Sequence, residues 1–112
     1  MDVSLAIPVE ATGDLEAWLV ENGATASEVV VAIFNKASAR QTVSLVELQE
    51  AALCHGWVDT QTRRIDDQRY AIRFVRRRPR STWSAKNREM ARRLLLAGRI
   101  APAGLATLPA DL

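Results

Sequence analysis

The sequence predicts a single α+β domain, in which a small and mainly antiparallel sheet packs against three to four helices. Two observations carry this prediction: apolar residues recur at helical spacing in several segments, and a β-type run is followed later by a long hairpin pattern. Residues 1–112 fit one domain with one hydrophobic core. The composition, 48% hydrophobic and 25% charged, excludes wholesale disorder.

Residues 1–56 predict two strands and two helices. Residues 3–9 alternate apolar side chains and contain Pro8, which predicts an edge strand because proline cannot donate to a β-ladder. Residues 14–22 predict a helix that has acidic residues in its first turn and ends before a glycine. Residues 28–34, EVVVAIF, are too apolar for an exposed strand and predict a central one.

The second helix is predicted to run from Leu45 to about His55. Ser44 and Glu47 have the spacing of a capping box, in which each side chain satisfies a backbone donor of the first helical turn. Gly56 marks the end of this helix, because glycine readily adopts the left-handed conformation that closes many helices.

Residues 57–77 predict a long hairpin that turns at Asp66 and Asp67, since aspartate favours turns. If the loop has an even number of residues, one face of the hairpin carries Trp57, Asp59, Gln61, Arg63, Ile65, Tyr70, Ile72 and Phe74. A loop with an odd number of residues would shift this pairing by one residue and exchange the faces.

A third helix is predicted after Pro79, which cannot continue a central strand, and either Ser81 or Ser84 caps it. The stripe along one side of this helix contains Trp83, Asn87, Met90, Leu94 and Leu95. Gly98 closes the helix, and Pro102 suits the first turn of a short terminal helix.

Positive charge is concentrated in the second half of the chain. Residues 1–60 hold nine acidic and two basic side chains, and residues 61–112 hold thirteen basic and four acidic ones, which gives the net charge of +2. The densest run, RRRPR at residues 76–80, lies where the hairpin meets the third helix. This asymmetry predicts either an anionic partner or attraction between the two halves of the fold.

The first functional hypothesis is a binding module with an anion-binding site at the strand-to-helix turn, residues 77–84. Guanidinium groups and the free N–H groups of a helix start both bind phosphate or carboxylate. The predicted site residues are Arg77, Arg78, Arg80, Ser81, Trp83 and Ser84, with Asp59, Asn87 and Arg73 as supporting polar groups. The competing interpretation is that the arginines are solvated or neutralise Asp59, while Trp83 lies in the core.

Two alternatives use other residues. A nucleic-acid-binding protein would extend the basic track along phosphates through Arg64, Arg69, Arg73, Lys86, Arg92, Arg93 and Arg99. An enzyme would use Cys54, His55 and Asp59, but adjacent helical residues point in different directions, so we predict that the protein is not an enzyme. Membrane-surface binding by the basic helix at residues 83–98 competes with its packing on the sheet.

Cofactors and metals are not predicted, because the chain has a single histidine and a single cysteine. The lone Cys54 cannot form an internal disulfide, which favours a reducing compartment. The N-terminal residues contain no basic leader, and no apolar stretch is long enough for a membrane span. We therefore expect a cytoplasmic protein.

Four sequence words, ALCHGWVD, DDQRYAIRF, RRPRSTWS and GRIAPAGL, occur in an order that resembles the bacteriocin-protection, YdeI or OmpD-associated family. The resemblance covers about residues 14–108. It implies a bacterial protein linked to protection against bacteriocins or antimicrobial peptides, or to stress, and it implies no catalytic residues. Direct contact with an outer-membrane porin conflicts with the expected cytoplasmic location, so any role in the envelope would be indirect.

Overall fold

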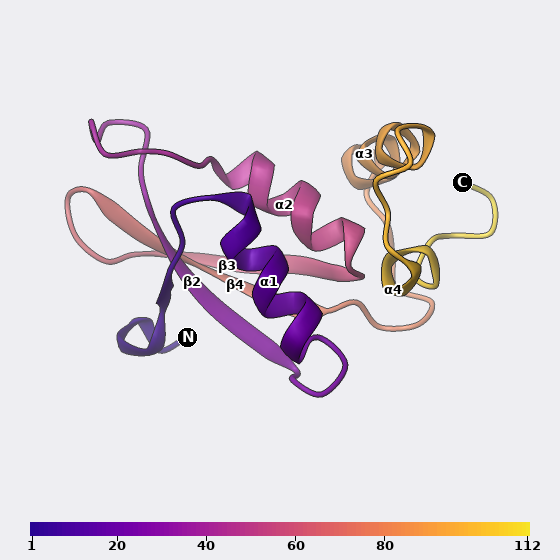
Figure 1. Cartoon of the computed structure of the whole chain (residues 1–112), viewed down its shortest axis with the longest axis horizontal. Helices are drawn as coiled ribbons and strands as arrows, with labels where there is room; N and C mark the ends of the chain where they lie inside the picture. The colour runs from indigo at the N-terminus through magenta and orange to yellow at the C-terminus, as the bar shows by residue number, and fades with distance from the viewer.

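Four strands form one mixed sheet in the order β1-β2-β4-β3 in the computed structural model, which describes residues 1–112 (Figure 1). The strands are β1 (Ile7–Pro8), β2 (Glu28–Phe34), β3 (Trp57–Arg64) and β4 (Arg69–Arg76). The short β1 runs parallel to β2, and the other two contacts are antiparallel. The predicted α+β class and the mainly antiparallel sheet are therefore confirmed.

Helices α1 (Thr12–Asn22) and α2 (Leu45–Cys54) lie side by side over one face of the sheet (Figure 1). Helices α3 (Ala85–Leu96) and α4 (Pro102–Leu105) lie beyond the end of the sheet, next to the C-terminal end of α2. None of the helices combines the length and the apolar character that a membrane span requires.

The main hydrophobic core lies between α1, α2 and the sheet. Alternate residues of the strands supply it, and Trp57 and Phe74 are its largest buried side chains. A second, smaller core joins α3 to the end of α2 around Met90 and Leu94. Leu95 was expected to widen the apolar stripe of α3, but its side chain is 44% exposed.

Residues 3–9 form a shorter strand than the alternation predicted. Only Ile7–Pro8 pairs with β2, at the edge of the sheet, while Val3–Leu5 forms a 3₁₀ helix. The carboxylate of Asp2 accepts hydrogen bonds from the backbone N–H of Ser4 at 2.9 Å and from its hydroxyl. Local capping of this kind competes with strand pairing and explains the difference.

The hairpin contains a β-bulge that the sequence did not predict. Asp59 pairs with Phe74 and Gln61 pairs with Arg73, so Thr60 is an extra residue on β3. Asp59 therefore lies on the predicted, helix-covered face. Beyond the bulge, the extra residue exchanges the two faces of β3. Gln61 therefore lies on the opposite face of the sheet, as does every second residue from Gln61 to the turn.

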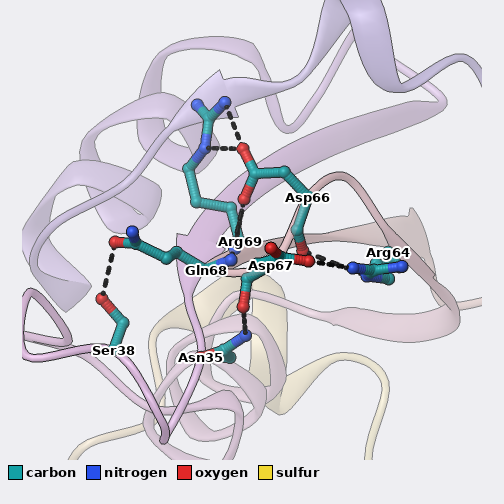
Figure 2. A network of polar contacts seen from close by, with 7 residues as sticks. All are labelled: Asn35, Ser38, Arg64, Asp66, Asp67, Gln68 and Arg69. Atoms are coloured by element: carbon teal, nitrogen blue, oxygen red, sulfur yellow. Dashed lines mark hydrogen bonds and ion pairs between the residues drawn. The ribbon is translucent and has the colours of Figure 1, made fainter.

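Figure 2 shows the residues that join the hairpin loop to the loop after β2: Asn35, Ser38, Arg64, Asp66, Asp67, Gln68 and Arg69. The carboxylate of Asp66 accepts hydrogen bonds from the backbone N–H groups of Gln68 and Arg69, both at 2.9 Å. The bond from Gln68, together with the guanidinium of Arg69, holds the pKa of Asp66 below its usual value. The amide of Asn35 donates to the carbonyl of Asp67 at 3.0 Å, which ties the two loops together.

Candidate functional site

A cleft of about 890 Å³ borders the face of the sheet opposite α1 and α2. We call this face, which carries Val30, Val58, Arg73 and Val75, the open face, because neither hydrophobic core includes its residues. The cleft extends from there to the start of α3. Its lining residues are Ser27, Val58, Thr60, Arg73, Val75, Arg76, Arg77, Arg78, Pro79, Ser81, Thr82, Ser84 and Asn87.

The lining contains four arginines, five hydroxyl side chains and no acidic residue, and we therefore call it the arginine cleft. One of the four, Arg73, is neutralised by a residue outside the lining. Its Nε lies 2.9 Å from Oε2 of Glu28, and its Nη1 donates to the hydroxyl of Thr60 at 3.1 Å. Arg73 is thus held against the strands by its own ion pair.

The other three arginines of the cleft have no carboxylate within ion-pair distance. Arg76 donates from Nη1 to the backbone carbonyl of Ala24 at 2.9 Å, which leaves its charge uncompensated. The side chain of Arg78 is exposed and makes no hydrogen bond within the protein. Three positive charges therefore remain available to an anion at this end of the fold.

Arg77 is the most firmly positioned of these three. Its guanidinium lies 3.8 Å from the centre of the Trp83 ring, and its Nη1 donates to the hydroxyl of Ser81 at 3.1 Å. Burial lowers the pKa of Arg77, and the negative charge of Asp59 opposes this effect. The guanidinium stays protonated at neutral pH, because arginine is effectively always protonated in proteins.

The first turn of α3 closes one end of the cleft. Ser84 caps the helix, since its hydroxyl accepts a hydrogen bond from the backbone N–H of Asn87 at 3.1 Å. The N–H groups of Thr82, Trp83 and Ser84 have no acceptor in the protein. The N–H groups of the next two residues, in the first turn of α3, also lack partners, because the first N–H groups of any helix have no carbonyl one turn earlier to accept them.

The structure brings most of the predicted site residues together. Four of the six predicted residues line the cleft, as do two of the three supporting groups: Arg77, Arg78, Ser81, Ser84, Arg73 and Asn87. Trp83 does not line the cleft, but the face of its ring is covered by the guanidinium of Arg77, and the side chain is half-buried against the smaller core.

Besides Trp83, two predicted residues are not part of the lining. Arg80 is exposed and adopts a left-handed conformation with φ of 59°, which lets the chain turn after Pro79. Asp59 lies on the covered face of the sheet, where its carboxylate accepts a hydrogen bond from Nε2 of Gln49 at 3.1 Å. Asp59 forms no ion pair with an arginine of the turn, although its negative charge acts on Arg77 from beyond ion-pair distance.

Sequence reasoning missed several lining residues, including Val58, Thr60 and Val75. The alternation of β4 could have indicated Val75, because it shares a face with Arg73. The placement of Thr60 depends on the bulge, and Ser27 approaches only because β2 pairs with β4. The positions of Thr60 and Ser27 thus depend on the pairing of strands that are distant in the sequence, rather than on any local sequence pattern.

The residues of the extended nucleic-acid track are mostly occupied. Six of the seven form ion pairs with carboxylates, and Lys86 is the exception. The pairs are Arg64 with Asp67, Arg69 with Asp66, Arg73 with Glu28, Arg92 with Glu89, and both Arg93 and Arg99 with Glu50. Attraction between the two halves of the fold thus accounts for three of them, whose partners lie in residues 1–60.

The three residues of the enzyme alternative make separate contacts. Cys54 is buried, and burial raises the pKa of its thiol, which keeps it protonated. The Nε2 of His55 lies 3.6 Å from a carboxylate oxygen of Glu16, and Asp59 is bonded to Gln49. No hydrogen bond joins the three side chains, although nucleophilic catalysis requires such contact.

A family model described as Domain of unknown function (DUF8412) matches residues 7–107. No curated protein and no solved structure matches the chain. The resemblance to the YdeI or OmpD-associated family is therefore wrong, because the match over nearly the whole chain is to a different family. The expected role in bacteriocin protection rested on that resemblance, which no longer supports it.

Proposed function

The chain belongs to the DUF8412 family, and we propose that it is a small binding module that captures a phosphate-bearing ligand in the arginine cleft. One observation carries this proposal. Arg76, Arg77 and Arg78 line a cleft that has no acidic lining residue, and no carboxylate forms an ion pair with them. A cleft lined by one sign of charge attracts ligands of the opposite sign.

The chemistry of the lining favours phosphate over other anions. The planar guanidinium fork matches the oxygens of a phosphate, and such charge-assisted hydrogen bonds are stronger than neutral ones. The unpaired N–H groups at Thr82–Ser84 lie beside the positive end of the α3 dipole. A phosphate monoester carries up to two negative charges at neutral pH and can use both kinds of donor.

A cytoplasmic location is part of this proposal, and the buried free thiol of Cys54 supports it. The proposal assigns no catalytic step to the cleft. Its hydroxyl and guanidinium groups bind and orient an anion, and they include no group with the neutral pKa of a general base.

The test is a calorimetric titration of the protein with inorganic pyrophosphate. Arg78→Gln removes one exposed guanidinium from the cleft, and we expect binding about tenfold weaker, since a hydrogen bond to a charged group contributes roughly 1.5 kcal/mol. Arg92→Gln is the matched control, because it removes the same charge from a paired arginine outside the cleft. We expect this control to stay within about twofold of the wild type.

Equal weakening in the two variants would mean that pyrophosphate is attracted only by the overall charge. If titration of the wild-type protein with pyrophosphate gave no measurable heat, the cleft would be rejected as an anion site altogether.

A further inference from the structure

We infer that the arginine cleft takes a small organic phosphate, whose phosphate group lies against Arg77 and Arg78 and whose carbon part rests on two valines. This inference rests on the proposed function and adds a ligand class to it. It follows from three features: the apolar floor of the cleft, the continuity of that floor with Arg77, and the pairing of the arginines beyond the cleft.

Val58 and Val75 form the floor. They are direct cross-strand partners on β3 and β4, they share the open face, and both are half-buried. They are the only hydrophobic residues of the lining, apart from the ring of Pro79. Side chains that face each other across an antiparallel pair form one contiguous apolar surface. An inorganic anion has no group that could cover this surface, whereas a carbon skeleton would remove it from water.

The floor continues directly into the cationic end of the cleft. Arg77 follows Val75 by two residues, and its backbone N–H still donates to the carbonyl of Gly56 at 2.9 Å. The extended conformation therefore persists past the end of β4 and places Arg77 on the side of Val75. The guanidinium is then fixed by Trp83 and Ser81. One ligand of the size of a phosphorylated ring can contact the valines and Arg77 together.

The charge pattern outside the cleft favours a small ligand over a polymer. A nucleic-acid strand needs a series of free cations along its phosphates. Beyond the cleft, most arginines that could continue such a series are bound to carboxylates, as in the pairs Arg64–Asp67 and Arg92–Glu89. Outside residues 76–80, the cations without a carboxylate partner are scattered over three different segments of the chain and include Arg40, Arg63 and Lys86. Unpaired guanidinium groups are densest at residues 76–80, where four of them lie within five residues, and this cluster is too short to follow a long strand.

The experiment compares phenyl phosphate with inorganic phosphate by calorimetry at pH 8, where both are dianions. We expect phenyl phosphate to bind about eightfold more tightly, the ratio produced by burying roughly 50 Å² of apolar surface. Val75→Thr keeps the shape of the side chain and makes it polar, so the preference for phenyl phosphate over inorganic phosphate should fall to about twofold. Val58→Thr provides a second variant if the first one folds poorly.

Val30→Thr is the matched control, because Val30 lies on the open face but not in the cleft, and the eightfold preference should persist. Equal affinity for the two phosphates in the wild type would overturn this inference and leave the proposed function intact. Absence of binding by both phosphates, and by pyrophosphate, would reject the proposed function itself. Tighter binding of oligonucleotides as their length grows beyond the cleft would show a polymer ligand and would also overturn the inference.

Discussion

Replacing Trp83 by leucine tests whether the cleft is a preorganised site or only a region of high charge. The substitution leaves every arginine in place, so the net charge and the charge around the cleft stay the same. It removes the ring on which the Arg77 guanidinium lies at 3.8 Å. If binding depends on the fixed position of this guanidinium, the affinity for pyrophosphate should fall although no charge has been lost.

The magnitude follows from the stacking contact. A cation–π contact at a half-buried site contributes about 1 kcal/mol. Without the ring, the guanidinium of Arg77 must be ordered when pyrophosphate binds, so the affinity for pyrophosphate should fall by up to about fivefold. Trp83→Phe keeps an aromatic face and should lose about half of that free energy. The assay is calorimetric titration with pyrophosphate, after urea unfolding has shown that each variant is folded. An affinity of Trp83→Leu equal to that of the wild type would refute the reasoning.

Four further substitutions test stability. Gly56→Ala should lower the free energy of unfolding in urea by at least about 2 kcal/mol, because φ is 80° and the new Cβ would lie 2.8 Å from the carbonyl oxygen of Ala103. Gly98→Ala, with φ of 69° but open space around it, should cost only about 1 kcal/mol, and equal losses would contradict the close approach at Gly56. Ser44→Ala should cost about 1 kcal/mol through the lost capping box, visible as a lower urea midpoint. Burial raises the pKa of the Cys54 thiol. The thiol therefore contributes stability that is present below the unfolded pKa of about 8.5 and is lost as the pH rises through the folded pKa. Cys54→Ala should accordingly flatten the fall in the free energy of unfolding above about pH 8.5.

The parts of the fold that were predicted correctly depend on local chemistry. The capping box of Ser44 and Glu47 forms as its spacing indicated, and Gly98 ends α3 in the left-handed conformation. The run of β-branched residues at 28–34 forms an inner strand of the sheet. In each case the residues that decide the structure are neighbours in the sequence, so the pattern contains the necessary information.

The parts that were missed depend on contacts between distant segments. The bulge at Thr60 follows from how β3 fits β4, and it changes which residues of the hairpin reach the open face. Whether an arginine is free or neutralised is equally a tertiary property, as the pairs of Arg73 with Glu28 and Arg93 with Glu50 show. The sequence therefore indicated the turn as the charged site, but it could not separate the paired arginines from the unpaired ones.

The most direct test of the central claim is an amide chemical-shift titration of the wild-type protein with pyrophosphate. We predict that the shifts concentrate at residues 76–87 and at Ser27 and Val58, which come from other parts of the chain and meet at the cleft. Shifts spread evenly over all arginines, including the paired Arg64 and Arg92, would contradict a defined anion site.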